Sequence, residues 1–267
     1  MLKAERQERI LELLGDEHTA SVRSVAEQLA VSEMTVRRDF EELAERGVVE
    51  RVYGGARLRH GTAKHGSLVE REFTHGEKAR LHAVEKRDIA RRAAALIEPR
   101  DTVFLGAGTT IEQMVSALPE VPFRIVTNSL AVFSLLEQRE GCDLCLVGGT
   151  YRSRTHAFVG PMAEDAIASL GIDKAFIGAN GVTDGSIFTS NAEEGRFQRL
   201  VFGKANERYL LADSSKVGRR DFYGFFDLGN IDAIFTDAAL TGEQRFELEQ
   251  YTRVERYLCG PARKRRR

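Results

Sequence analysis

Four polar side chains near the N-terminus have the types and the spacing that suit contact with a DNA duplex. They are Ser32, Thr35, Arg37 and Arg38. An arginine can form two hydrogen bonds to a guanine edge or to a phosphate, and a threonine offers a hydroxyl and a methyl group to the bases. A serine at a helix start can bind a backbone phosphate together with the unpaired N–H groups there. These residue types predict DNA recognition, with a solvated basic face on an interaction module as the alternative.

A second basic segment follows directly. The stretch VVERVYGGARLR has two β-prone runs around Gly54 and Gly55, and a glycine pair suits the tight turn of a hairpin. Arginines on such a hairpin can reach phosphates or the minor groove. We expect a wing on which Arg51, Arg57 and Arg59 contact DNA. Net charge does not decide this point, because residues 1–60 carry 10 Lys and Arg against 12 Asp and Glu.

A glycine-rich loop in the second half of the chain has the residues of an anion site. Gly106–Thr110 reads GAGTT, between a strand-like run and a helical one. Glycines allow a ligand close to the backbone, and threonine hydroxyls and N–H groups can donate to a phosphate. The loop is not a dinucleotide fingerprint, because Ile111 stands where the third glycine is needed, and it lacks the Gly-Lys-Ser/Thr of a P-loop. A packing role for the glycines remains the alternative.

Polar side chains also follow the other strand-like runs. Lys216 offers a cation for a phosphate, while Asn128, Asn180 and either Glu193 or Glu194 suit sugar hydroxyls. Each residue alone could serve a turn, but their repetition after successive strands favours a site. The predicted effector-binding residues are Gly106, Gly108, Thr109, Thr110, Asn128, Ser129, Gly149, Arg152, Asn180, Glu193 and Lys216.

The elements that must position the DNA-contacting residues are short helices. A first helix covers about 3–14 and ends at Gly15, a second begins at the N-cap Ser21, and a third begins at the N-cap Ser32. A connection of so few residues between the last two predicts a helix-turn-helix, whose second helix enters the major groove. The inward-facing residues of the third helix are Val36, Phe40 and Leu43.

The second half alternates strands with helices. Short, nearly continuous apolar strands separated by helices predict a mostly parallel sheet covered on both faces, with a ligand site at the carboxyl ends of the strands. Thr241 and Gln244 fit a capping box at the start of a late helix. The strand candidates are 102–105, 124–127, 143–147, 174–178, 208–213 and 232–237.

Composition limits the class of protein. The chain has 267 residues, of which 42% are hydrophobic and 30% charged, with a net charge of −1. It contains no apolar run of the roughly 18–20 residues that a membrane helix needs, and its N-terminus lacks the apolar core of a signal peptide. We therefore expect a cytoplasmic protein. Cys142 and Cys145 lie in a strand-like run and are expected to be buried and inert; no metal site or cofactor is predicted.

The N-terminal segment resembles, nearly end to end, the signature of the DeoR/GlpR family of bacterial repressors. The most specific matches are S-x-x-T-V-R-R-D, from Ser32 to Asp39, and R-x-x-G-G-A, from Arg51 to Ala56. The resemblance implies that Ser32, Thr35, Arg37 and Arg38 contact operator DNA. Asp39 could instead be structural and pair with an arginine.

The second half resembles the sensor domain of the same family, across roughly 75–258. The matching motifs are GTT, TNS, GG, KAFIGANGV and DSSK, although Gly106 stands where many members carry aspartate. The resemblance implies a fold related to ribose-5-phosphate isomerase and a phosphorylated sugar as effector. The run SNAEEGRFQ is most similar to the fructose and lactose phosphotransferase repressors, which suggests fructose 1-phosphate or tagatose 6-phosphate.

Two other classes of protein stay open beside a sugar-responsive repressor. An isomerase with an accessory DNA-binding domain would need a general base, for which Glu193, Glu194 or Asp213 could serve, but no convergent acid–base set is evident. A non-sugar interaction protein would leave the glycine loop without a role. We predict a homodimeric or homotetrameric repressor and not an enzyme. Its predicted parts are a winged helix-turn-helix (1–58), a linker (59–74), an α/β sensor domain (75–258) and a basic tail (259–267).

Overall fold

The computed structural model divides the chain into two compact units, Met1–Val69 and Glu70–Arg267. The predicted linker, Arg59 and the basic tail lie outside the described residues. Among the helices of the described residues, none has the length and apolar character needed to cross a membrane. The residues that the structure describes are 6–7, 9–11, 13–14, 19–45, 49–52, 54–58 and 75–256.

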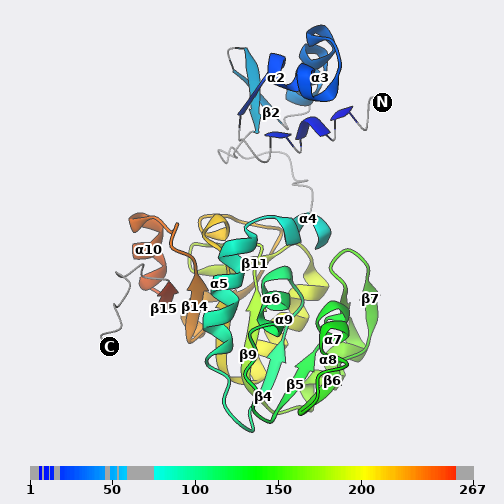
Figure 1. Ribbon diagram of the computed structural model, residues 1–267. Helices are drawn as coiled ribbons and strands as arrows, with labels where there is room; N and C mark the ends of the chain where they lie inside the picture. The colour runs from blue at the N-terminus through cyan, green and yellow to red at the C-terminus, as the bar shows by residue number, and fades with distance from the viewer. Residues whose placement is uncertain are drawn as a thin grey trace, which may run out of the picture. The chain divides into compact units, whose positions relative to one another are not determined.

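The first unit combines helices with a small antiparallel sheet of order β1-β3-β2 (Figure 1). The described residues among 6–14 are helical, and Ser21 caps the second helix by accepting a hydrogen bond from the Ser24 N–H. All three predicted inward-facing residues of the third helix are buried, which confirms that helical phase. The other elements are β1 (Thr19–Ser21), α2 (Val22–Leu29), α3 (Glu33–Glu45), β2 (Val49–Val52) and β3 (Gly55–Leu58).

The predicted hairpin is present, and only the first glycine of the pair lies in its turn. Val52 pairs with Gly55, and Gly54 lies in the connection with a φ of 78°. Gly55 belongs to β3, where a Cβ would lie 2.2 Å from the Ala20 carbonyl oxygen. Because Gly55 has no side chain, β1 can lie close enough to pair with β3. Strand β1 was not predicted from the sequence.

The second unit is built on a seven-stranded sheet in which every neighbouring pair is parallel. All six predicted strands are confirmed, with ends shifted by up to three residues. In spatial order the strands are β15 (Arg253–Arg256), β14 (Ala233–Thr236), β12 (Ala205–Leu211), β9 (Ile172–Gly178), β4 (Thr102–Leu105), β5 (Phe123–Thr127) and β6 (Cys142–Leu146).

Apolar residues on both faces of this sheet form two separate cores. Val103 and Leu105 pack with α5, α6 and α7, whereas Phe104 packs on the opposite face with α8, α9 and α10. The doubly covered parallel sheet is thereby confirmed. The helices of this unit are α4 (His75–Arg80), α5 (Ala83–Ala94), α6 (Thr109–Val115), α7 (Leu130–Leu136), α8 (Pro161–Ala168), α9 (Ala192–Lys204) and α10 (Gly242–Glu249).

Several short elements were not predicted. A small antiparallel sheet, β10-β11-β13, adds apolar residues to the α9 side of the core, and β7 and β8 form a hairpin after β6. The capping box of α10 at Thr241 and Gln244 is confirmed. The additional elements are β7 (Thr150–Arg152), β8 (Ala157–Val159), β10 (Gly181–Thr183), β11 (Ser186–Thr189), β13 (Tyr223–Asp227) and the 3-10 turns Ser214–Lys216 and Leu228–Asn230.

The expectation of two buried cysteines is wrong. Cys145 is exposed and Cys142 is only partly buried. Both lie on β6, which is the last strand of the sheet and, among the described residues, pairs with β5 alone. An edge strand lacks a neighbour on one side, and a strand-like sequence run does not reveal whether it lies at the edge.

The order of the strands indicates where a ligand site is expected. From β4 the chain adds β5 and β6 on one side, then crosses to β9, β12, β14 and β15 on the other. The order therefore reverses between β4 and β9. In open parallel sheets, the loops that diverge from the carboxyl ends at such a point leave a crevice.

Candidate functional site

The start of α3 presents the predicted DNA-contacting residues around a serine cap. The Ser32 Oγ accepts a hydrogen bond from the Thr35 N–H at 3.2 Å and lies 2.8 Å from the Thr35 hydroxyl. Ser32 is exposed and Thr35 is half-buried. Arg37 and Arg38 follow on the exposed side, and the Arg38 side chain is 84% exposed. The structure thus gathers these four residues at the accessible end of one helix.

Asp39, the last residue of the same motif, has a different position. It is only 1% exposed and accepts hydrogen bonds from Arg6 Nε at 2.6 Å and from Gln7 Nε2 at 3.3 Å. The hydrogen bond to Asp39 raises the pKa of the Arg6 guanidinium above its ordinary value. Asp39 therefore ties α3 to the first helix, as the structural interpretation of this residue expected.

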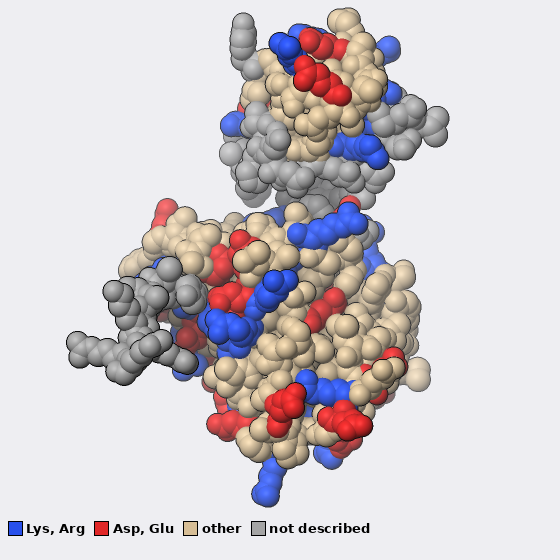
Figure 2. All heavy atoms as spheres, viewed as in Figure 1, with Lys and Arg blue, Asp and Glu red and all other residues tan. Residues whose placement is uncertain are grey.

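Each predicted DNA-contacting arginine that the structure describes has a carboxylate partner. Ion pairs between exposed side chains contribute about 0–1 kcal/mol, so a phosphate can replace the carboxylate at little cost. Figure 2 shows acidic and basic side chains next to one another on the visible face of this unit. The pairs are Arg37–Glu33 at 3.6 Å, Arg38–Glu42 at 3.9 Å, Arg51–Glu41 at 2.8 Å and Arg57–Glu50 at 2.9 Å.

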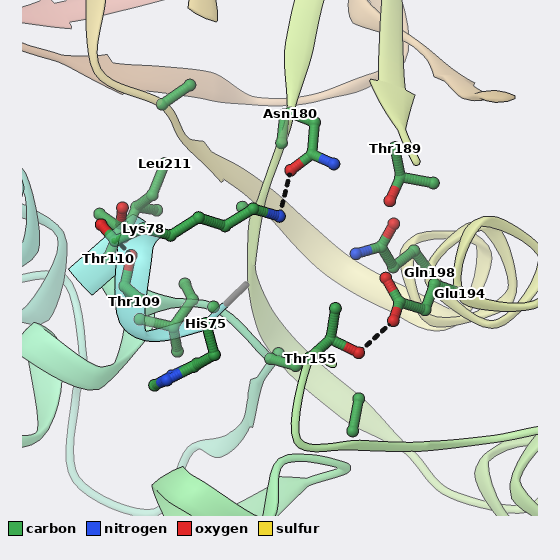
Figure 3. A pocket seen from close by; sticks show the side chains of 18 of the residues that line it. His75, Lys78, Thr109, Thr110, Thr155, Asn180, Thr189, Glu194, Gln198 and Leu211 are labelled. Atoms are coloured by element: carbon green, nitrogen blue, oxygen red, sulfur yellow. Dashed lines mark hydrogen bonds between the residues drawn. The ribbon is translucent and has the colours of Figure 1, made fainter. Parts of the chain in front are cut away.

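In the second unit a cavity opens at the carboxyl ends of β4, β9 and β12 (Figure 3). It lies where the strand order reverses, as the parallel topology predicts. Seven of the eleven residues predicted to bind an effector line it. They are Gly106, Gly108, Thr109, Thr110, Asn128, Asn180 and Lys216.

The other four do not line the cavity. Ser129 is buried as the N-cap of α7, and a Cβ at Gly149 would lie 2.7 Å from the Val159 carbonyl oxygen. Arg152 lies behind the lining, where its Nε donates to Glu194 Oε1 at 2.9 Å. Glu193 is exposed, whereas Glu194 lines the cavity. Successive helical residues project about 100° apart, so the two glutamates point in different directions.

The cavity also contains two lysines that sequence reasoning missed, Lys78 on α4 and Lys86 on α5. Lys86 is only 4% exposed. Burial lowers its pKa to about 8, a shift that Asp213 opposes and that Lys216 and Lys78 reinforce. Burial also lowers the pKa of Lys216. Lys86 stands among other charged residues of α5, and no local pattern in the sequence distinguishes it as the buried one.

Helix α4 is attached to the rim of this cavity by several contacts. Lys78 Nζ donates to Asn180 Oδ1 at 3.1 Å, and the Lys78 carbonyl accepts hydrogen bonds from Lys86 Nζ and, at 3.4 Å, from Thr109 Oγ1. His75 Nε2 lies 2.5 Å from Glu112 Oε1. Helix α4, the first helix after the predicted linker, is therefore hydrogen-bonded to the glycine loop.

The opposite end of the cavity has hydrogen-bonding side chains from α9. Glu194 is 8% exposed, and its Oε1 accepts hydrogen bonds from Arg152 and from the Thr155 hydroxyl. Gln198, one turn further along α9, also lines the cavity. Figure 3 shows Glu194 and Gln198 facing the cavity from the side away from Thr109 and Thr110.

These two sites define the class of protein. One unit presents a helix-turn-helix with exposed arginines, and the other holds a cavity lined by three lysines and suited to a small anion. Such a combination is that of a ligand-responsive DNA-binding regulator.

Comparison with known families agrees with this class. Residues 6–62 match the DeoR-like helix-turn-helix domain, and residues 81–238 match the DeoR C terminal sensor domain. The chain belongs to the DeoR family, and it is a transcriptional regulator rather than an enzyme.

The chain is similar to named repressors over most of its length. It is 38% identical to the lactose phosphotransferase system repressor of Streptococcus mutans, covering 95% of this chain and 99% of that protein. Identity to the repressor of the same name from Lactococcus lactis subsp. lactis is 40%, covering 95% and 98%. Among solved structures, ribose 5-phosphate isomerase A of Methanocaldococcus jannaschii matches with a TM-score of 0.37 and 22% identity, over 49% of this chain and 52% of that one.

Proposed function

We propose that the protein represses a sugar-metabolism operon and that a phosphorylated sugar bound in the cavity regulates its affinity for operator DNA. The carrying observation is the convergence of Lys78, Lys86 and Lys216 beside the hydroxyls of Thr109 and Thr110. Three ammonium groups at one end of a cavity leave a surplus of positive charge, which a phosphate dianion neutralises through charge-assisted hydrogen bonds. Asp213 supplies a compensating carboxylate, and it also caps the turn that holds Lys216.

For the effector we favour a ketohexose phosphate, fructose 1-phosphate or tagatose 6-phosphate. Two relatives of high coverage are named lactose phosphotransferase system repressors, which supports a sugar phosphate produced in such a system. The lining combines the cations with amide and carboxylate groups on the other side of the cavity, as a polyhydroxyl phosphate requires.

For DNA we propose that the N-terminal part of α3 enters the major groove, with Ser32, Thr35, Arg37 and Arg38 at bases and phosphates. Arg51 and Arg57 on the hairpin then contact the backbone. Each arginine exchanges its glutamate partner for a phosphate or a base. We further propose a cytoplasmic homodimer or homotetramer, whose two-fold symmetry requires repeated or palindromic half-sites.

Helix α4 supplies a route by which the cavity can influence the DNA-binding unit. A ligand shifts an equilibrium only when it binds one arrangement better than the other. A phosphate that contacts Lys78 and Thr109 acts on the contacts that fix α4, and α4 follows the predicted linker directly in the chain. We propose that this helix transmits effector binding.

A mobility-shift assay tests the function. The full-length protein is mixed with DNA from upstream of its own gene, with and without fructose 1-phosphate, tagatose 6-phosphate or inorganic phosphate. We expect a specific shift that at least one sugar phosphate changes by tenfold or more. Lys216→Met should abolish the response and leave DNA binding intact, whereas Lys204→Met, an exposed lysine on α9, should change neither. If no sugar phosphate alters DNA affinity or melting temperature, the proposed effector class is wrong.

A further inference from the structure

We infer that Gln198 and Glu194 on α9 select the sugar by hydrogen-bonding to hydroxyls at the end of the effector remote from its phosphate. This inference rests on the proposed function and assigns a specificity role within the same cavity. It makes Gln198 a residue that distinguishes a sugar phosphate from phosphate itself.

The cavity has two chemically different ends. Lysines and threonine hydroxyls gather near α4, α5 and the glycine loop, and all of these groups can donate hydrogen bonds to an anion. The α9 end carries a carboxylate and a primary amide instead. A phosphate dianion is repelled by a carboxylate and attracted by ammonium groups, so it has one favourable end in this cavity. The sugar then lies toward α9.

Gln198 has an unused hydrogen-bonding atom. Its Oε1 is buried and has no hydrogen-bond partner among the described residues. A buried polar atom without a partner costs free energy, and most such atoms in folded proteins are paired. Because Gln198 lines the cavity, turning its side-chain amide over brings this oxygen to a ligand hydroxyl. The amide also carries two N–H donors, so it can act as donor and acceptor toward a hydroxylated ligand.

Glu194 is held in place for the same task. Its Oε1 accepts both the Arg152 guanidinium and the Thr155 hydroxyl, which positions the carboxylate at the cavity wall. Among the described residues both of these contacts are made to Oε1, and Oε2 is the atom assigned to a sugar hydroxyl. Arg152 ends β7 and Thr155 lies in the turn between β7 and β8, and both act here as positioning residues.

Two ligands separate this role from a purely structural one. Inorganic phosphate occupies only the lysine end, whereas fructose 1-phosphate or tagatose 6-phosphate also reaches α9. Gln198→Met keeps the length of the side chain and removes its hydrogen bonds. Calorimetry on the full chain should show that this variant binds the better sugar phosphate at least about tenfold more weakly, with phosphate affinity changed less than about twofold.

Glu194→Gln provides a second variant in case Gln198→Met does not fold, and the same split is expected from it. Arg196→Gln, on the exposed side of α9, is the matched control and should leave both affinities unchanged. The melting temperature of each unliganded variant reports its folding.

Three outcomes contradict the inference in distinguishable ways. If the wild-type chain binds neither sugar phosphate, the proposed function fails and this inference fails with it. If sugar phosphates bind and Gln198→Met leaves their affinity unchanged, only the inference is wrong. Equal losses for phosphate and sugar phosphate would also overturn it, because a distorted cavity rather than a lost hydroxyl contact would then explain the result.

Discussion

The two units of this chain present their cations in opposite environments. On α3 and its hairpin the arginines are exposed, and each pairs with a nearby glutamate. In the sensor cavity Lys86 is almost fully buried, and burial lowers the pKa of both Lys86 and Lys216. Exposed cations suit a long polyanion that displaces many weak surface pairs at once. Buried lysines suit a single small anion that relieves their mutual repulsion.

The largest difference between the two sites should be in how their binding affinities depend on salt concentration. Four phosphate contacts per protomer make eight in the proposed dimer, so operator affinity should fall about 10⁴-fold between 50 and 200 mM salt, because the free energy gained by releasing counterions from DNA decreases as the salt concentration rises. The effector affinity should fall less than about tenfold, since buried charges are screened less than exposed ones. Fluorescence anisotropy for DNA and calorimetry for the sugar phosphate measure both slopes. If both affinities had the same salt dependence, the proposed difference between an exposed and a buried anion site would be wrong.

Substitutions at two neighbouring positions of α3 should have different effects, one on the stability of the first unit and the other on its affinity for DNA. Asp39→Ala removes the buried partner of Arg6 and should destabilise the first unit by about 3 kcal/mol, measured by chemical denaturation. Arg38→Ala removes an exposed side chain and should weaken operator binding by about 2 kcal/mol, roughly 30-fold, with stability unchanged. A large loss of stability in Arg38→Ala would mean that the side chain supports the fold instead.

The lowered pKa of Lys86 predicts opposite pH trends for ligand affinity and for stability. Lys86 must carry a proton to bind a phosphate, so effector affinity should stay level near pH 7. It should fall through pH 8 by up to about tenfold per unit. The native state releases this proton near pH 8 and the unfolded state only near 10.5, so the unliganded protein should gain stability between those values.

Calorimetry and thermal melting from pH 6.5 to 9.5 measure the two trends, with Lys86→Arg as the variant that keeps its charge. That variant should show a flat affinity profile. A wild-type affinity that stays constant to pH 9.5 would argue against a phosphate contact at Lys86.

The smallest effect should come from the glutamates that pair with the exposed arginines. Glu41→Gln removes the partner of Arg51 and should strengthen DNA binding by about 0.5 kcal/mol, roughly twofold, at low salt. Glu243→Gln on α10, in the other unit, is the matched control for charge. A loss of DNA affinity in Glu41→Gln would mean that the ion pair orients Arg51 for contact.

Much of the architecture followed from local pattern. The strands at 102–105 and 232–237, the Ser21 and Ser32 caps and the buried phase of Val36 depend on neighbours within a few residues, and the structure confirms them. The glycine loop also lines the cavity, because the carboxyl ends of parallel strands meet at one edge. Here local pattern and topology lead to the same residues.

The sequence by itself determined the two units, six strands of the parallel sheet and the motif residues of α3, because periodicity, capping and turn residues act over one or two helical turns. Tertiary structure alone decided that Lys78 and Lys86 join Lys216, since these lysines come from α4, α5 and the end of β12. It also decided that Glu194 rather than Glu193 faces the cavity. Which side of a helix is covered depends on what packs against it from distant parts of the chain.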